Sequence, residues 1–242
     1  MENRTMQAAN HILIIEDDPA VASSLQDGLQ RDSYRVAWKS TGSDGLHYAR
    51  QHNPHLIILD VRLPDGSGFD YCRQMRQNGI RQPIIMLTVQ RDEMDKILGL
   101  EMGADDYVTK PYSLRELRSR VRAQLRRAYG ELSNADADQF YVGDLIIDRS
   151  RGLVQRDNQP IYLTPTEFRL LVFLARHRGQ ALTRTQLLDE VWGYDSDVES
   201  ERIVNVHIRR LREKIEVDPG QPALILTVPG VGYRLAEQVT RL

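Results

Sequence analysis

The sequence predicts an α/β fold: a five-stranded parallel sheet, doubly wound by helices, followed by a second and smaller α+β domain. In the first half of the chain, short apolar runs alternate with amphipathic helical patterns, as in consecutive βα units. After about residue 140, short alternating segments separated by turn residues replace that pattern. The chain has 242 residues, which is long enough to bury two cores.

Five βα units are predicted in the first half, and residues 11–128 form the first expected domain. The runs HILIIE, LIILD and PIIMLT are short, rich in β-branched residues and apolar throughout, as strands buried on both faces are. Weaker strands are expected at 34–38 and 106–109. Amphipathic helices are predicted at residues 20–31, 43–52, 69–77, 91–102 and 114–127.

The polar segment YGELSNADADQ, residues 129–139, is expected to be a linker, and residues 140–236 form the second domain. This domain opens with FYVGDLIIDRSRGLVQRDNQPIYL, in which short strands alternate with turn signals and predict a small antiparallel sheet. Thr164 with Glu167, and Thr183 with Gln186, have the spacing of a capping box, so a helix is expected to begin at each. A third helix at 200–217 and two final strands in LILTVPGVGYRL complete the domain.

Composition is that of an ordinary globular protein, with 41% hydrophobic and 27% charged residues. No run approaches the roughly 18 apolar residues of a membrane span, and the polar start lacks a secretory signal. Cys72 is the only cysteine, which excludes an intrachain disulfide and a cysteine-rich zinc site. We therefore expect a cytoplasmic protein that does not associate with a membrane. The formal net charge of −2 gives no support for nucleic-acid binding, so any such activity depends on the local placement of arginines.

Several polar segments are expected at one edge of the parallel sheet, beyond the carboxyl ends of its strands. These are Glu16-Asp17-Asp18, Asp60, Thr88 and Lys110. Converging carboxylates repel one another unless a cation neutralises them, and oxygen ligands suit Mg²⁺ or Mn²⁺. Phosphoryl transfer to a carboxylate needs an acceptor, a metal and a positive side chain. Asp60, Asp17 with the metal, and Lys110 fill these roles, so the edge is predicted to be a phosphoryl-transfer site.

The segments IIEDDP, LDVRLPDGSG, MLT and GADDYVTKPYS resemble, in order and spacing, the receiver domain of bacterial response regulators. The resemblance covers about residues 11–128 and implies a flavodoxin-like fold with Asp60 as phosphoacceptor. The implied metal ligands are Asp17, Asp60, the backbone carbonyl of Arg62 and, through water, Glu16.

The same resemblance implies a switch. Thr88 is assigned to a phosphoryl oxygen, Lys110 to charge pairing and Tyr107 to the aromatic that reports the change, with a cis peptide before Pro111. The chain departs from the family at Val89, where a small residue usually follows the switch threonine. A bulkier side chain there can narrow access to Asp60 and alter the lifetime of the phosphoryl group.

In regulators with this type of output domain, the resemblance implies dimerisation on phosphorylation through the fourth helix, fifth strand and fifth helix of the receiver. Phosphorylation adds roughly two negative charges and biases nearby loops. The expected pairs are Lys96 with Glu116, and Asp105 and Asp106 with arginines such as Arg120 and Arg122. Solvated helix faces are the alternative explanation of these charges.

The third helix of the second domain has an apolar stripe that is expected to face the core, formed by Val204, Ile208, Leu211 and Ile215. Arg202, Val206, Arg209 and Arg210 are expected to face away. Exposed arginines around an apolar residue suit a major groove, where guanidinium groups contact guanine edges or phosphates. A solvated charged helix is the alternative.

The segments LTPTEFRLLVFLARHRGQALTRTQLLDEVWG, ESERIVNVHIRRLREKIE and TVPGVGYRL resemble the OmpR/PhoB-type winged helix-turn-helix domain. The resemblance implies that the third helix enters the major groove, with Arg210 as the candidate base reader. The implied phosphate contacts are Arg202, His207, Arg209, Arg212 and, on the wing, Thr227, with a structural role as the alternative for His207. Residues 193–199 match a loop that can meet RNA polymerase. Pro229 replaces the wing-tip arginine of many members, so affinity is expected to depend more on the recognition helix and on dimerisation.

The expected function is that of a two-component response regulator and not of an enzyme. A sensor histidine kinase phosphorylates Asp60, which promotes homodimerisation and sequence-specific binding to double-stranded DNA. One alternative is a phosphorylation-independent DNA-binding regulator, but degenerate receivers usually lack part of the acid, threonine and lysine set found here. Another is a phosphatase of the haloacid-dehalogenase type, which needs a second acid two residues after its nucleophile, whereas Arg62 occupies that position. The input signal, the kinase, the promoters and the sign of regulation are not encoded in one sequence.

Overall fold

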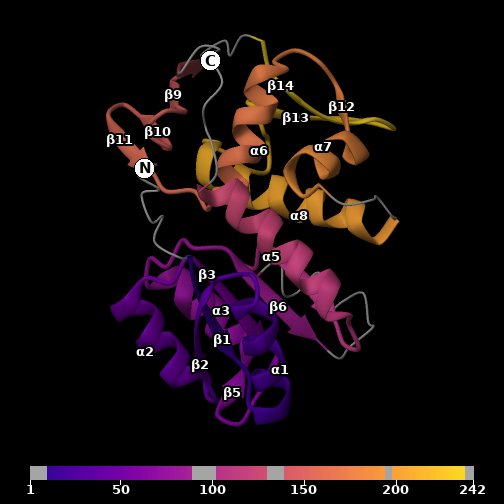
Figure 1. Cartoon of the computed structure of the whole chain (residues 1–242). Coiled ribbons are helices and arrows are strands. Elements are labelled where there is room, and N and C mark those ends of the chain that lie inside the picture. The colour runs from indigo at the N-terminus through magenta and orange to yellow at the C-terminus, as the bar shows by residue number, and fades with distance from the viewer. Residues whose placement is uncertain (1–9, 89–101, 130–138, 194–197, 238–242) are drawn as a thin grey trace, which may run out of the picture. The chain divides into compact units, whose positions relative to one another are not determined.

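The computed structural model describes residues 10–88, 102–129, 139–193 and 198–237 (Figure 1). The chain divides into two compact units, residues 1–125 and 126–242. Among the described residues, no helix is both long and apolar enough to cross a membrane. The predicted linker falls largely on residues outside the described ranges, so its limits stay a prediction.

The first unit contains a five-stranded parallel sheet in the order β2-β1-β3-β6-β7. Its strands are β1 (His11–Ile15), β2 (Arg35–Lys39), β3 (Leu56–Asp60), β6 (Ile84–Thr88) and β7 (Asp106–Thr109). This order confirms the predicted doubly wound, flavodoxin-like fold. The direction of winding reverses between β1 and β3, and the carboxyl ends of strands at such a switch point are where open α/β sheets bind ligands.

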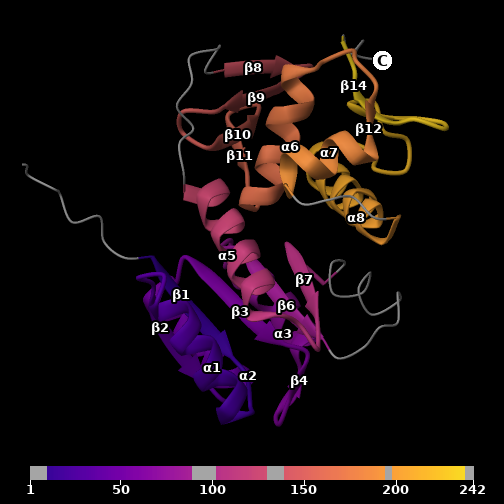
Figure 2. The same ribbon diagram turned by 45° about the vertical axis from the view of Figure 1, so that its right-hand side comes forward.

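Four described helices flank this sheet: α1 (Pro19–Gln30), α2 (Gly42–His52), α3 (Gly68–Gln77) and α5 (Leu114–Tyr129) (Figure 2). Because strand side chains alternate between faces, Ile12 and Ile14 pack with α1 and α5, whereas Leu13 and Ile15 pack with α2 and α3. Both faces are therefore buried, which explains why the strands are apolar throughout. The helix expected at 91–102, with Lys96, lies almost wholly outside the described residues, and Val89 lies outside them too.

A small hairpin, which the sequence reading did not predict, lies between β3 and α3. Its strands are β4 (Arg62–Leu63) and β5 (Gly66–Ser67), and they pair in antiparallel fashion. Two residues a strand are too few to show the alternation on which strand prediction depends. The hairpin places Arg62 two residues beyond the end of β3.

The second unit begins with an antiparallel sheet in the order β11-β10-β9-β8, as predicted. Its strands are β8 (Gln139–Val142), β9 (Leu145–Asp148), β10 (Leu153–Arg156) and β11 (Gln159–Ile161). The turn between β10 and β11 holds Asp157 and Asn158 at φ values of 48° and 62°. Aspartate and asparagine tolerate this left-handed region better than most residues, which accounts for the turn signal in the sequence.

Three helices follow: α6 (Pro165–Arg176), α7 (Arg184–Val191) and α8 (Val198–Ile215). Both predicted capping boxes form, Thr164 with Glu167 on α6 and Thr183 with Gln186 on α7. Strands β13 (Ile225–Val228) and β14 (Gly232–Leu235) form the expected terminal hairpin. A short strand, β12 (Leu182–Thr183), adds to β14 and was not predicted. Helices followed by a hairpin wing confirm the winged helix-turn-helix.

The orientation of α8 corrects part of the prediction. The stripe of Val204, Ile208, Leu211 and Ile215 is buried as expected. However, Val206 and Arg210 are only 7% and 8% exposed, so the expectation that they face away from the core is wrong. Each residue turns a helix by about 100°, which places both beside the buried Ile203, a residue that the predicted stripe omitted. The buried face is therefore wider than predicted, and of the four residues only Arg202 and Arg209 are exposed.

A buried histidine makes the stability of the first unit sensitive to acid. His11 is 2% exposed, and an Arg35 nitrogen lies 3.0 Å from its Nδ1. Burial, followed by the charge of Arg35 and the neighbouring His55 and His52, lowers the pKa of His11 below its ordinary value. A lowered histidine pKa gives stability that is present above the unfolded value of about 6.5 and lost as the pH falls through the folded value.

We predict that the free energy of unfolding falls between about pH 7.5 and pH 5.5, because the unfolded chain gains a proton that folded His11 resists. Urea denaturation at both pH values measures the fall, which should be smaller in His11→Gln. His47→Gln is the matched control because His47 is exposed. A fall of equal size in His11→Gln and the wild type would contradict the assignment.

Candidate functional site

Three carboxylates meet at the carboxyl edge of the parallel sheet. Glu16 and Asp17 follow β1, and Asp60 is the last residue of β3. One oxygen from each of the three lies within 4.8 Å of the others, a group that could hold a metal ion. Glu16 and Asp60 are 1% and 5% exposed, whereas Asp17 is exposed. The predicted cluster is therefore present, with one carboxylate open to solvent.

Asp18, which the sequence groups with these acids, has a different role. Its side chain accepts hydrogen bonds from the backbone N–H groups of Ala20 at 2.8 Å and Val21 at 3.3 Å. It is the N-cap of α1, with Pro19 in the first helical turn. This cap fixes the start of α1 next to the cluster, and Asp18 is not part of the metal group.

Lys110 supplies the positive charge of the site. Its Nζ lies 2.8 Å from Oε2 of Glu16 and 3.0 Å from Oδ2 of Asp60. Its backbone N–H donates to the carbonyl of Thr88 at 2.5 Å, and the peptide bond to Pro111 is cis, as the family pattern predicts. Thr88 ends β6 and is 3% exposed. Residues from β1, β3, β6 and the segment after β7 thus meet at one edge.

The charges of the site are not balanced. Burial raises the pKa of Glu16 to about 7, with the hydrogen bond from Lys110 opposing the rise and the charge of Asp60 adding to it. Burial lowers the pKa of Lys110, but hydrogen bonds to Glu16 and Asp60 outweigh it and leave that pKa above its ordinary value. Among the described residues, one ammonium group, that of Lys110, pairs with this group of three carboxyl groups. Mg²⁺ or Mn²⁺, which prefer oxygen ligands, fit this surplus of negative charge.

The remaining implied residues lie close by in the chain. Arg62, whose carbonyl is the implied third ligand, is the first residue of β4. Tyr107 is half-buried on β7.

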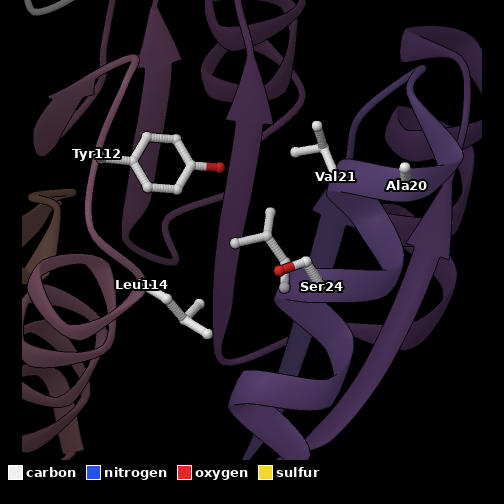
Figure 3. A pocket seen from close by; sticks show the side chains of 6 residues that line it. Ala20, Val21, Ser24, Tyr112 and Leu114 are labelled. Carbon is white, nitrogen blue, oxygen red and sulfur yellow. The ribbon is translucent and has the colours of Figure 1, made fainter.

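Tyr112 is one of six residues lining an open cavity of about 390 Å³ beside α1, which sequence reasoning did not find. The others are Ala20, Val21, Ser24, Leu25 and Leu114, and the Tyr112 hydroxyl points toward the α1 side (Figure 3).

The candidates for dimerisation divide into two groups. Asp105 is fully buried, pairs with Arg76 at 2.6 Å and accepts from the Ile84 N–H at 3.0 Å, so the prediction that it forms an exposed pair is wrong. Asp106 is also fully buried, so the prediction that it forms an exposed pair is wrong as well. Within the same chain, Arg120 lies 3.2 Å from Asp106 and 3.1 Å from the exposed Glu116. Arg122 is exposed.

The predicted DNA-contacting residues of α8 differ in exposure. Arg202 and Arg209 are exposed, and Arg209 pairs with Glu213 at 3.2 Å. His207 is fully buried, with its ring 4.9 Å from that of Trp192 and its Nδ1 3.0 Å from the Ile203 carbonyl. This burial favours the structural alternative for His207 over phosphate contact.

Arg212 and Thr227 join α8 to the wing. The Arg212 guanidinium donates to the carbonyl of Ile225 at 2.6 Å and to Oγ1 of Thr227 at 2.9 Å. Thr227 and Pro229 are both exposed on the wing. The recognition helix and the wing are therefore held in one arrangement by a side chain at their junction.

Glu167 is a fully buried carboxylate of the second unit, at the start of α6. It accepts the Thr164 N–H at 2.8 Å, and its carboxylate oxygens lie 3.1 Å from Arg210 and 2.5 Å from Lys214. Burial opposes its charge, but Arg210 and Lys214 outweigh that effect and lower its pKa to about 2. The start of α6 is thus tied to α8, and Arg210, the candidate base reader, already has a partner.

Two family descriptions match the chain. Residues 12–122 match "Response regulator receiver domain", and residues 158–235 match "Transcriptional regulatory protein, C terminal". The transcriptional regulatory protein AfsQ1 of Streptomyces coelicolor is 48% identical over 224 residues, covering 93% of this chain and 97% of that protein. The chain belongs to the OmpR/PhoB family of response regulators. It consists of a receiver domain and a DNA-binding domain.

Other relatives agree with this membership. The alkaline phosphatase synthesis transcriptional regulatory protein PhoP of Bacillus subtilis is 44% identical over 232 residues, covering 93% of this response regulator and 96% of PhoP. Among solved structures, a mutant of RitR with a serine in place of a cysteine has a TM-score of 0.76 at 33% identity, covering 95% of this chain and all of that one. DrrB, an OmpR/PhoB homologue from Thermotoga maritima, has a TM-score of 0.50 at 34% identity, covering 94% and 99% of the two chains.

We predict that Glu167→Ala destabilises the DNA-binding domain by about 3–5 kcal/mol, because it leaves two cations without their buried partner. The lowered pKa of Glu167 gives stability that is present above about pH 4.5 and lost as the pH falls toward 2. Urea denaturation followed by the emission of Trp192 measures the loss near neutral pH.

Glu213→Ala is the matched control, because Glu213 is 51% exposed and its pair with Arg209 is worth about 0–1 kcal/mol. Equal losses in the two variants would show that Glu167 has no special structural role.

Proposed function

We propose that a sensor histidine kinase transfers a phosphoryl group to Asp60, and that this promotes dimerisation and sequence-specific binding to double-stranded DNA. The observation that carries the proposal is the meeting of Asp60 with Glu16, Asp17 and Lys110 at the switch point of the sheet. Family membership supports it, because the relatives are transcriptional regulators. Such a protein acts in the cytoplasm, where DNA and the kinase domain are accessible.

In the proposed reaction, a carboxylate oxygen of Asp60 attacks the phosphorus of the phosphohistidine. The phosphorus–nitrogen bond breaks, and the imidazole leaves with its electron pair. A bound Mg²⁺ or Mn²⁺ would neutralise the charge of the phosphoryl oxygens. Asp17, Asp60, the Arg62 carbonyl and, through water, Glu16 would hold that ion.

Lys110 and Thr88 then receive the product. In the unphosphorylated structure the ammonium group of Lys110 lies 3.0 Å from Asp60. After the transfer it pairs with one phosphoryl oxygen, and the hydroxyl of Thr88 donates to another. Movement of Thr88 and Tyr107 carries the change to β7 and α5. The output face formed there holds Glu116, Arg120 and Arg122, with Lys96 as the further candidate, and the buried Asp106 fixes Arg120 through their ion pair.

In the DNA-binding domain, α8 enters the major groove. Arg202 and Arg209 are the exposed cations of that helix and contact phosphates, with Arg212 and Thr227 at the wing. Arg210 reads a base edge only by giving up its ion pair with Glu167. Residues 193–199 are the proposed contact for RNA polymerase, and four of them lie outside the described ranges.

We predict that acetyl phosphate with Mg²⁺ adds one phosphoryl group to the wild type and none to Asp60→Asn, because the variant replaces the proposed acceptor carboxylate beside Lys110 with an amide. Intact mass spectrometry measures the addition, and size-exclusion chromatography measures the expected shift to a dimer. An unmodified wild type that is folded, dimeric and bound to DNA would favour the phosphorylation-independent regulator instead.

We also predict that Arg209→Ala lowers affinity for a mixed-sequence DNA duplex and reduces the slope of log affinity against log salt by about 0.9, the loss of one phosphate contact. Fluorescence anisotropy over a salt series measures the slope. Arg151→Ala, at an exposed arginine in the turn before β10, is the control and should leave it unchanged. An unchanged slope in Arg209→Ala would remove that residue from the interface.

A further inference from the structure

The hairpin that carries Arg62 is fastened to the start of another helix by one side chain. Asp65, in the turn between β4 and β5, accepts the backbone N–H of Gly42 at 2.9 Å through Oδ1 and that of Ser43 at 2.9 Å through Oδ2. Thr41 accepts the next donor, the N–H of Asp44, at 3.2 Å. Asp65 therefore satisfies two first-turn donors of α2 that the N-cap residue leaves unpaired.

Tyr71 closes the same contact from α3. Its hydroxyl donates to Oδ2 of Asp65 at 2.8 Å. Its ring lies against the start of α2 so closely that a Cβ placed at Gly42 would meet it at 2.1 Å. Three segments, the hairpin turn, the start of α2 and the first turns of α3, thus meet at the carboxylate of Asp65.

The base of the hairpin is fixed to the end of β3, the strand that carries Asp60. The N–H of Gly68 donates to the carbonyl of Val61 at 2.8 Å, and a Cβ at Gly68 would lie 2.0 Å from the carbonyl oxygen of Asp60. Arg62 pairs with Ser67 across the hairpin. With its base held at β3 and its turn held by Asp65, the hairpin has a defined position, and so has the Arg62 backbone within it.

We propose that Asp65, together with Tyr71, is a positioning residue for the metal site: it holds the β4–β5 hairpin so that the Arg62 carbonyl faces the ion bound by Asp17 and Asp60. This inference rests on the metal binding assigned under the proposed function. Asp65 does not touch the ion, and it acts through the backbone of the hairpin. Groups that orient a metal ligand in this way typically contribute 10- to 100-fold to metal affinity.

The lowered pKa of Asp65 shows that its hydrogen bonds stabilise the charged carboxylate. Burial opposes its charge, but the hydrogen bonds from Ser43, Gly42 and Tyr71 outweigh that effect and hold its pKa well below the ordinary value. The carboxylate is therefore charged across the physiological range. Its negative charge also lies at the positive end of the α2 dipole.

The test measures Mn²⁺ binding to the unphosphorylated full chain by the loss of the free Mn²⁺ paramagnetic resonance signal, with competition by Mg²⁺. Asp65→Asn keeps the size of the side chain but faces the Ser43 N–H with an amide donor, so Mn²⁺ should bind about 10-fold more weakly. Tyr71→Phe removes only the hydroxyl contact and should weaken binding by less.

Asp70→Asn is the matched control. Asp70 lies on α3, is 54% exposed and pairs with Arg73 one turn away, so the variant loses the same charge while the contacts of Asp65 with α2 and Tyr71 stay intact. The proposal is overturned if Asp65→Asn, shown by urea denaturation to be fully folded, binds Mn²⁺ like the wild type. It is also overturned if Asp70→Asn weakens Mn²⁺ binding equally, since equal weakening would show a long-range effect of the lost charge and not the positioning of the hairpin. Absence of Mn²⁺ binding in the wild type itself would contradict the proposed metal site instead.

Discussion

The structure of the receiver domain depends on the contact of Lys110 with two buried carboxylates. Glu16 and Asp60 lie 1% and 5% exposed at the ends of neighbouring strands, and each is within 3.0 Å of the lysine ammonium group. Removing a buried charge's partner costs about 3–5 kcal/mol, so the contact with Lys110 holds the segment after β7 against the ends of β1 and β3. In the proposed function, a phosphoryl group on Asp60 offers Lys110 a new partner. The same contact would then carry the effect of phosphorylation to the segment after β7.

The DNA-binding domain meets the same constraint with Glu167. A carboxylate that the helix start requires for its capping box is buried, and Arg210 and Lys214 of α8 balance it. The orientation of the recognition helix relative to α6 is thus fixed by charge as well as by its apolar face. Arg212 extends the same rigidity to the wing through Ile225 and Thr227. The proposed DNA contacts of Arg202 and Arg209 thus lie on a helix whose position is set before binding, which reduces the entropic cost of ordering on binding.

The strands of the parallel sheet, the starts of α6 and α7 and part of the acidic site could be predicted, because each depends on residues close together in the sequence or on a general property of parallel sheets. The unbroken apolar runs gave the parallel strands, and the threonine-to-glutamate and threonine-to-glutamine spacings gave the starts of α6 and α7. Asp60 and Lys110 were found because the ends of parallel strands share an edge. Two predictions were wrong because the burial of the residue depends on a distant partner. Asp105 is buried in an ion pair with Arg76, and Arg210 is buried in an ion pair with Glu167. The β4–β5 hairpin was missed for a different reason, since its four paired residues are too few to show a period. Asp65 was missed because the two backbone N–H groups that it accepts, those of Gly42 and Ser43, lie more than 20 residues earlier in the chain.

The proposed function requires that Glu16, Asp17, Asp60 and the Arg62 carbonyl form one cation site beside Lys110. The most direct measurement is the anomalous difference density of crystals soaked in Mn²⁺. A peak in contact with the carboxylates of Asp17 and Asp60 and the carbonyl oxygen of Arg62, with Lys110 still within reach of Asp60, is the predicted result. Mn²⁺ bound elsewhere on the receiver, with this edge of the sheet empty, would contradict the account.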